Sequence, residues 1–226
     1  MNAAKEFADT SSFGVARPVL SGGESVNGAT AAPCFAQAAE RGSRAVPGEG
    51  VDLSISVEQA RHEAARDALL DRAMGPRWRK KSSHRLRRGR LPAEGLAFVA
   101  TDGTGAVVGT VRLWDVTAGE GGSAMLLLGP LAVDPGVKSA GIGSALMREA
   151  IAEAKRLGHK AILLVGDAPY YARFGFSAEK TGRLAMPGPY ERHRFLALEL
   201  VEGALDGAAG VLQAAGRKRA ADRKAA

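Results

Sequence analysis

A run of small residues joining an apolar stretch to a helix-like stretch is the part of this chain best suited to chemistry. It comprises Lys138, Ser139, Ala140, Gly141, Ile142, Gly143 and Ser144. Successive backbone N–H groups in such a turn can point inward, and the start of a helix adds about half a positive charge. A Cβ on either glycine would hold an anion away from these amides. The pattern predicts an anion site and favours a phosphate.

Three kinds of phosphate-binding loop compete for this segment. A Walker A loop requires Lys-Ser or Lys-Thr after its last glycine, but Ser144-Ala145 follows here. A dinucleotide-binding loop requires a small residue where Leu146 stands, and it follows the first strand of a parallel sheet. The third kind binds a pyrophosphate with the pattern Gln or Arg, two residues, Gly, one residue, Gly or Ala. Lys138 to Gly143 fits this third pattern, with lysine in the first place.

Two other segments contain residues that could take part in chemistry. Gly129-Pro130 interrupts the apolar run "AMLLLGPLAV". Because proline cannot donate to a sheet ladder, we expect a bulge or a splayed strand there. The segment "PYYARFGF" places Tyr171 four residues before Gly175, and a phenol can act as a proton donor.

Apolar periodicity predicts the elements that must position these segments. Strands are expected at residues 51–56, 95–100, 105–116, 123–133, 160–166 and 192–205. A helix is expected from residue 57 to Gly75, a second at 143–157 and a short third at 169–175. Asp102-Gly103 indicates a hairpin between the second and third strands. This order predicts a mixed α/β fold around one sheet.

Each of the two longer helices has a predicted buried face. The first face consists of Val57, Ala60, Ala64, Ala68 and Leu69, and Ser56 and Gln59 stand at capping-box spacing before it. The second consists of Leu146, Met147, Ala150, Ile151, Ala154 and Leu157.

With these elements in place, the chain resembles the GNAT superfamily of acyl-CoA N-acyltransferases. The resemblance rests on the pyrophosphate loop, "LAVDP" before it, the amphipathic helix after it, "AILLVG" and "YYARFGF", all in the family's order. It covers residues 51–204 and implies an α/β (α+β) fold with a mostly antiparallel central sheet, a splayed strand at the acetyl-CoA site and flanking helices. It also implies transfer of an acetyl group from acetyl-CoA to an amine by direct attack.

The resemblance also implies roles for single residues. Acetyl-CoA would be bound by Leu131, Ala132 and Val133 together with Lys138 to Ser144. The backbone N–H groups of Leu131 and Val133 would hold the pantetheine arm and polarise the thioester carbonyl. Tyr171 would protonate the leaving thiolate, and Tyr170 is the alternative, because the phase of the short helix decides which phenol faces the cofactor.

The general base and the acceptor stay open. The strand before the loop carries no acid, and Asp167 and Glu120 are candidates only. The acceptor could be a small amine, a protein N-terminus, a lysine or an RNA-linked amine. The size of the acyl group and the oligomeric state are also undetermined.

The basic segment "RWRKKSSHRLRRGR", residues 77–90, leaves three interpretations open. It could cover the acceptor site, contact nucleic acid, or form a solvated surface. Trp78 within it is expected to be a packing residue. Two further functions therefore stand beside the enzyme: a non-catalytic acyl-CoA-binding module, and a nucleic-acid-binding protein that uses residues 77–90.

The composition of the whole chain predicts a globular protein with a tail at each end. Its 226 residues are 46 % hydrophobic and 24 % charged, with 31 Lys plus Arg against 24 Asp plus Glu. Residues 1–50 are expected to be a flexible leader, 51–204 the N-acetyltransferase domain, and 205–226 a frayed, basic, Ala-rich tail. No apolar run approaches the roughly 20 residues of a membrane span. One cysteine, Cys34, and scattered histidines predict a cytoplasmic protein without a metal site.

Overall fold

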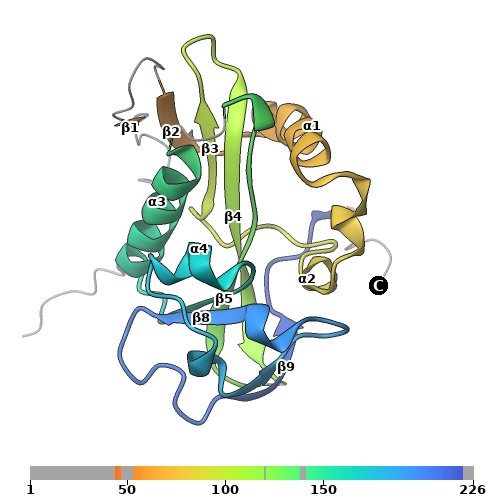
Figure 1. The fold of residues 1–226 in the computed structure, drawn as a ribbon. Helices are drawn as coiled ribbons and strands as arrows, with labels where there is room; N and C mark the ends of the chain where they lie inside the picture. The colour runs from red at the N-terminus through yellow and green to blue at the C-terminus, as the bar shows by residue number, and fades with distance from the viewer. Residues whose placement is uncertain (1–43, 47–52, 120, 138–140, 221–226) are drawn as a thin grey trace, which may run out of the picture. The chain divides into compact units, whose positions relative to one another are not determined.

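The central sheet is the frame that positions the rest of the chain (Figure 1). The structure, a computed structural model, describes residues 44–46, 53–119, 121–137 and 141–220. Within these residues nine strands form one sheet, with the path β1-β2-β3-β4-β5-β6-β8, while β9 pairs with β4 and β7. The strands are β1 (Arg44–Val46), β2 (Leu53–Val57), β3 (Ala97–Thr101), β4 (Val107–Ala118), β5 (Ala124–Val133), β6 (Ala161–Val165), β7 (Arg183–Ala185), β8 (Phe195–Glu199) and β9 (Ala209–Ala214).

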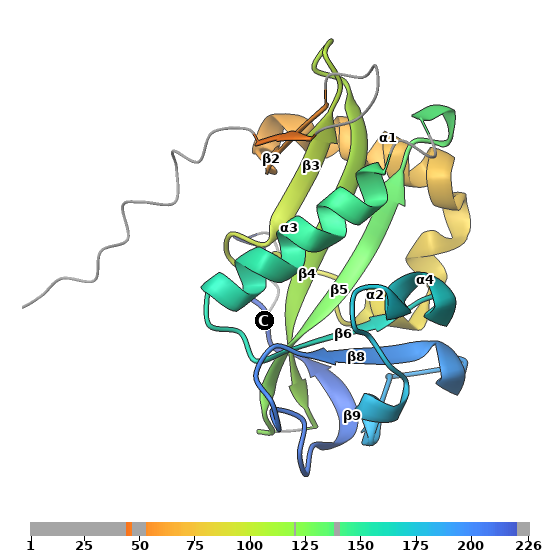
Figure 2. The same ribbon diagram turned by 60° about the vertical axis from the view of Figure 1, so that its left-hand side comes forward.

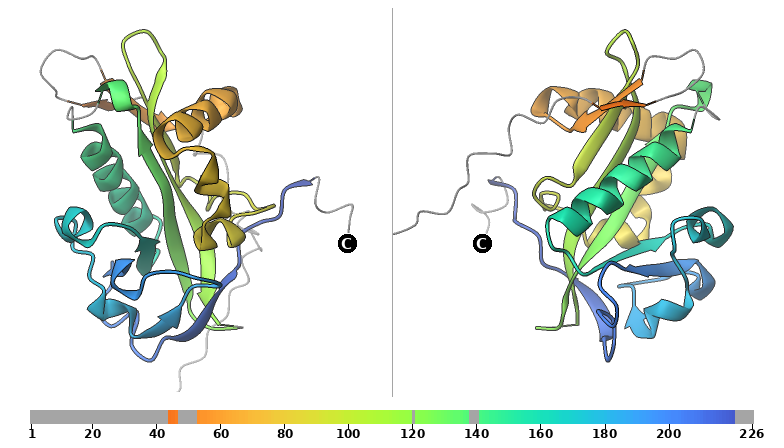
Figure 3. Two further views of the ribbon diagram at one scale, coloured as in Figure 1. Left: turned by 45° about the vertical axis from the view of Figure 1, so that its right-hand side comes forward. Right: turned by 90° about the vertical axis from the view of Figure 1, so that its left-hand side faces the viewer.

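Helices cover both faces of this sheet. They are α1 (Glu63–Met74), α2 (Ser82–Arg85), α3 (Ile142–Arg156) and α4 (Ala168–Ala172). Short 3₁₀ turns join them: η1 (Ala60–His62), η2 (Pro76–Lys80), η3 (Pro135–Val137), η4 (Glu179–Thr181) and η5 (Arg192–Arg194). Helix α1 packs on β4 and β5 from one face, and α3 packs on β3, β4 and β5 from the other (Figure 3).

The predicted order of strands and helices is confirmed for the described part of the chain. The β3–β4 hairpin is antiparallel, β4–β5 is antiparallel, and β6 pairs with β8 antiparallel. The pair β5–β6 is parallel, with α3 as its crossover. Strands β1 and β7 were not expected.

The expected tail contains a strand. Frayed structure was predicted for residues 205–226, and this is wrong for residues 209–214, which form β9. Strand β9 pairs with Val116 to Ala118 of β4, beyond Arg112, where the pairing of β3 with β4 begins. It thus completes the half of β4 that β3 leaves free, and the sheet continues past residue 204. The predicted leader, apart from residues 44–46, lies outside the described residues.

The buried faces of the two long helices differ in how well they were predicted. The face of α3 is confirmed by Leu146, Met147, Ala150 and Ala154, whereas Leu157 lies past the helix end and is 40 % exposed. The predicted face of α1 is wrong except at Leu69. The residues that α1 buries are Arg66, Leu69 and Leu70. The capping box at Ser56 is also wrong, because β2 continues to Val57 and α1 begins only at Glu63.

Candidate functional site

Strand β5 has a defect where one was expected. The register between β4 and β5 shifts by one residue between Val111 and Leu113, so that Gly129 and Pro130 both lie opposite Arg112. The peptide bond between Gly129 and Pro130 is cis. The indole Nε1 of Trp114 donates to the Gly129 carbonyl oxygen at 2.5 Å. The predicted bulge in the strand is therefore confirmed.

Beyond this defect β5 separates from β6 (Figure 2). The two strands pair only at Leu126 with Ile162 and at Leu127 with Leu163 among the described residues. The N–H of Asp134 donates to the Val108 carbonyl on β4. Because hydrogen-bonded and free pairs alternate along antiparallel strands, the N–H groups of Leu131 and Val133 point away from β4. These two amides lie on the edge of β5 that faces away from β4, whereas the N–H of Ala132 faces β4.

The glycine loop leads from β5 into α3. Lys138, Ser139 and Ala140 lie outside the described residues. Gly141 stands before the helix with a φ of 72°, and a Cβ built on it would meet no described residue within 4 Å apart from its chain neighbours. Open space thus adjoins the first amides of α3, where an anion would gain from the helix dipole. Ile142 is buried in the core and Ser144 is half-buried.

Two tyrosines of α4 face different surroundings. A Cβ built on Gly143 would lie 2.9 Å from the Tyr170 hydroxyl and 3.5 Å from Val133 Cγ2. The Tyr170 hydroxyl therefore lies beside the start of α3 and the end of β5. The ring of Tyr171 packs instead on Gly166, at the end of β6, and against Phe176. Burial, together with the neighbouring Tyr170, raises the pKa of Tyr171 to about 12.

The two candidate bases fall in different parts of the chain. Asp167 is the exposed residue before α4, and its backbone carbonyl accepts hydrogen bonds from Tyr170 and Tyr171. Glu120 lies outside the described residues. Strand β5 itself carries no acid.

The basic segment folds over the α1 face of the sheet. Its elements η2 and α2 follow α1, and Trp78 is buried against Leu70 and Ala132, as expected of a packing residue. A cavity of about 420 Å³ lies beneath this segment, next to Pro130 of β5. Its other lining residues are Glu63, Arg66, Asp67, Leu70, Trp78, His84, Arg87, Arg88, Gly89, Arg90, Arg112, Trp114 and Arg219. The cavity therefore places cationic side chains next to the defect in β5.

Comparison with known proteins decides the family. Residues 93–178 match the acetyltransferase (GNAT) domain. The N-acetyltransferase YhbS of Escherichia coli K12, itself uncharacterized, is 31 % identical over 147 residues, which make up 65 % of this chain and 87 % of YhbS. This chain belongs to the GNAT family of N-acetyltransferases.

Solved GNAT structures share the fold of this chain. The crystal structure of E. coli YhbS in complex with CoA aligns with a TM-score of 0.63 at 28 % identity, over 80 % of this chain and 98 % of YhbS. A GNAT acetyltransferase from Brucella melitensis in complex with acetyl-CoA aligns with a TM-score of 0.53 at 24 % identity, over 75 % and 97 % of the two chains. Both confirm the predicted GNAT-like sheet with flanking helices.

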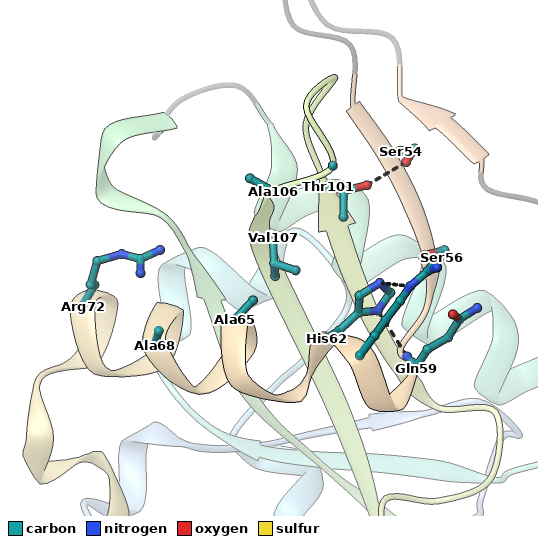
Figure 4. A pocket seen from close by; sticks show the side chains of 12 residues that line it. Ser54, Ser56, Gln59, His62, Ala65, Ala68, Arg72, Thr101, Ala106 and Val107 are labelled. Atoms are coloured by element: carbon teal, nitrogen blue, oxygen red, sulfur yellow. Dashed lines mark hydrogen bonds between the residues drawn. The ribbon is translucent and has the colours of Figure 1, made fainter.

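A larger hollow of this GNAT chain lies elsewhere. It measures about 750 Å³ and lies between α1, β2 and the β3–β4 hairpin (Figure 4). Its polar groups bond to one another: Ser54 to Thr101 at 3.0 Å, and the Gln59 N–H to His62 Nδ1 at 3.2 Å. No described residue of β5, α3 or α4 lines this hollow.

Two features are absent from the described part of the GNAT chain. None of its helices is both long and apolar enough to span a membrane. No three of its His, Cys, Asp or Glu residues gather into a possible metal site.

Proposed function

We propose that this chain is an active acyltransferase that moves the acetyl group of acetyl-CoA to an amine. The observation that carries this proposal is the pair of amides at Leu131 and Val133, which point away from β4 and have no partner strand among the described residues. Two similar proteins support the proposal, because the YhbS structure contains CoA and the Brucella structure contains acetyl-CoA.

The residues around these two amides fit such a ligand. The open space at Gly141 adjoins the first amides of α3, which would bind phosphate oxygens together with Lys138 to Ser144. The amides of Leu131 and Val133 would bind the pantetheine arm and the thioester oxygen, with Ala132 between them. Donors already held by the sheet need no reorganisation when negative charge develops on that oxygen.

The reaction has a simple balance. Acetyl-CoA supplies the acetyl thioester, the amine nitrogen forms a bond to its carbonyl carbon, and the carbon–sulfur bond breaks. The nitrogen loses one proton and the thiolate gains one. Because β5 carries no acid to take the first proton, we propose that the amine enters uncharged, so that activity rises with pH toward the pKa of the amine.

Tyr171 is the proposed donor of the second proton. A phenol whose pKa is raised to about 12 by burial stays protonated at neutral pH, so its O–H is available to the leaving thiolate. Tyr170, beside Gly143, is the alternative donor. A solitary Cys34 supports a reducing, cytoplasmic setting, which we also propose.

The first test is acetyl-CoA binding by a matched pair of variants. Gly141→Asp and Gly141→Asn have nearly equal size, and both side chains tolerate a positive φ, so they differ mainly in charge. We expect the Asp variant to bind acetyl-CoA about ten-fold more weakly than the Asn variant in calorimetry, because its carboxylate would face the phosphates.

The same titration separates the alternatives. Binding of acetyl-CoA with release of free thiol in the presence of an amine panel supports the transferase. Binding without thiol release from any amine would leave an acyl-CoA-binding module. No binding by the folded wild type would overturn both proposals, and salt-dependent binding to random RNA would then favour a nucleic-acid function.

A further inference from the structure

The cavity beneath residues 77–90 contains more buried positive than negative charge. Three of its guanidinium groups are buried, those of Arg66, Arg87 and Arg112. Both Arg66 and Arg112 bond to the carboxylate of Glu58, whose side chain is 6 % exposed. Arg66 also contacts Asp67 at 2.8 Å. These two guanidinium groups are therefore neutralised within the protein.

Arg87 differs from them. It is 7 % exposed, and no described acidic side chain pairs with it. Its Nε donates to the Ser83 carbonyl at 3.2 Å and its Nη2 to the Ser83 hydroxyl at 3.1 Å. No described group accepts a hydrogen bond from its Nη1. A buried cation without an anion is costly, so the position calls for an anionic ligand.

The free end of Arg87 lies at the defect in β5. Its Nη1 would be 3.8 Å from a Cβ built on Gly129, which precedes Leu131 by two residues. Two residues of a strand span about 7 Å. An anion bound by Arg87 would therefore lie within about 10 Å of the amide of Leu131, where the proposed function puts the thioester carbonyl.

We infer that this cavity binds the acceptor, and that Arg87 binds a carboxylate carried close to the reacting amine, as in a free amino acid. The inference rests on the proposed function and names its substrate class. The separation of about 7 Å between Gly129 and Leu131 favours an amino acid over a polyamine or a peptide N-terminus, which lack a carboxylate next to the amine. Guanidinium donors match a carboxylate in geometry as well as charge.

The walls of the cavity indicate the rest of the acceptor. Trp78, Trp114 and Leu70 provide apolar surface, and a volume of about 420 Å³ accommodates a large side chain. His84 also lines the cavity, and burial followed by the charges of Arg87, Arg79 and Arg88 lowers its pKa. This shift favours the neutral imidazole, so Arg87 is the buried cation left for the carboxylate. An apolar or aromatic amino acid fits this surface best.

The test compares amino acids with their amides. L-phenylalanine and L-leucine would be offered with acetyl-CoA to the full chain, beside L-phenylalaninamide and L-leucinamide. The amide keeps the amine and the side chain but removes the charge. We expect kcat/KM for the acids to exceed that for the amides by at least about ten-fold, after correction for the ionisation of each amine.

Variants then assign this preference to one residue. In Arg87→Gln the ratio should fall to about one through loss of rate with the acids, while the rate with the amides is kept. Arg87→Lys, which keeps the charge and is the second variant if Gln prevents folding, should retain part of the preference. Lys81→Gln removes an exposed positive charge of the same segment outside the cavity lining, and it should leave the ratio unchanged.

A binding measurement distinguishes failure of this inference from failure of the proposed function. N-acetyl-L-phenylalanine and its amide would be titrated by calorimetry into the protein, with and without CoA. Tighter binding of the acid, lost in Arg87→Gln, supports the carboxylate site even if no amine is acetylated. Equal binding of acid and amide, or no binding of either, overturns the inference while leaving acetyl-CoA binding untouched.

Discussion

The backbone of Gly143 faces the hydroxyl of Tyr170. A Cβ at position 143 would lie 2.9 Å from that oxygen, closer than unstrained side chains approach. Gly143 belongs to the first turn of α3, and Tyr170 belongs to α4, which follows β6. Two segments that the chain separates by a helix and a strand thus meet at the seat proposed for the cofactor. The absence of a side chain at position 143 therefore makes room for the Tyr170 hydroxyl, in addition to any room that it leaves for a ligand.

This contact predicts that one substitution has different effects on stability in two backgrounds. Gly143→Ala should change the free energy of unfolding little, because a helical gain of up to about 1 kcal/mol offsets the clash with the phenol. In Tyr170→Phe, where the clashing oxygen is absent, the same substitution should stabilise by about 1 kcal/mol. Chemical denaturation of the four proteins measures the coupling. Equal effects in both backgrounds would contradict the contact.

The two tyrosines should affect different kinetic constants. We expect Tyr171→Phe to lower kcat by about 100-fold, the lower end for loss of a positioned proton donor, with KM for acetyl-CoA nearly unchanged. Tyr170→Phe, the matched control, should chiefly raise KM, because its hydroxyl lies at the start of α3. Steady-state kinetics with a good acceptor makes the comparison. A larger loss of kcat in Tyr170→Phe would exchange the two roles.

The parts of the site that sequence could predict are those in which the backbone itself is unusual. Pro130 cannot donate to a sheet ladder, and Gly141 adopts a φ of 72°. Both backbone features require particular residue types, proline and glycine, which the sequence shows directly. The stripe of α3 is visible because its partners are all apolar. In each case the local sequence carries the cause.

The parts that it missed depend on partners distant in the chain. Arg66 is buried in α1 where Glu58, which follows β2 in the chain, pairs with it, so the helix does not show an apolar stripe there. Strand β9 is rich in Ala and Gly, and it is ordered by pairing with β4 and β7. The position of Arg87 could not be predicted for the same reason. It lies beside Gly129, which is 42 residues further along the chain.

His84 should make the protein less stable in acid. Burial and the neighbouring cations Arg87, Arg79 and Arg88 lower its pKa from the usual 6.5, so the unfolded chain binds the proton more tightly. The contribution of His84 to stability is therefore fully present above about pH 6.5, its unfolded pKa, and falls as the pH drops below 6.5 toward the lowered pKa of the folded state. We expect the melting temperature to decrease between pH 7.5 and 5, and His84→Phe, which keeps an aromatic ring against Trp78, to weaken this dependence. The pKa of His62 is lowered as well, so the part of the pH dependence that is due to His62 should remain in the variant.

Arg87→Met should not destabilise the protein, and we expect it to raise the melting temperature by a few degrees. Burial and Arg112 lower the pKa of Arg87 to about 10, so the side chain is a cation held in an unfavourable place at neutral pH. Replacing an unneutralised buried charge by an apolar chain of similar length removes that cost. The two hydrogen bonds to Ser83 are lost and limit the gain. A clear drop in melting temperature would mean that Arg87 is structural, with no need of a ligand.

Glu58→Gln should be strongly destabilising, in contrast to the change at Arg87. The Glu58 carboxylate bonds to both Arg66 and Arg112, and all three side chains are at most 10 % exposed. An amide of the same shape keeps the packing but leaves two buried guanidinium groups without an anion between them, and breaking such a pair costs about 3–5 kcal/mol. Asp67→Asn, which removes a charge 43 % exposed from the same Arg66, should cost about 1 kcal/mol or less. Denaturation curves of the two variants, measured beside the wild type, compare these losses directly. Similar losses would show that Arg66 draws its stability from the exposed carboxylate, and that Glu58 does not organise the wall of the cavity.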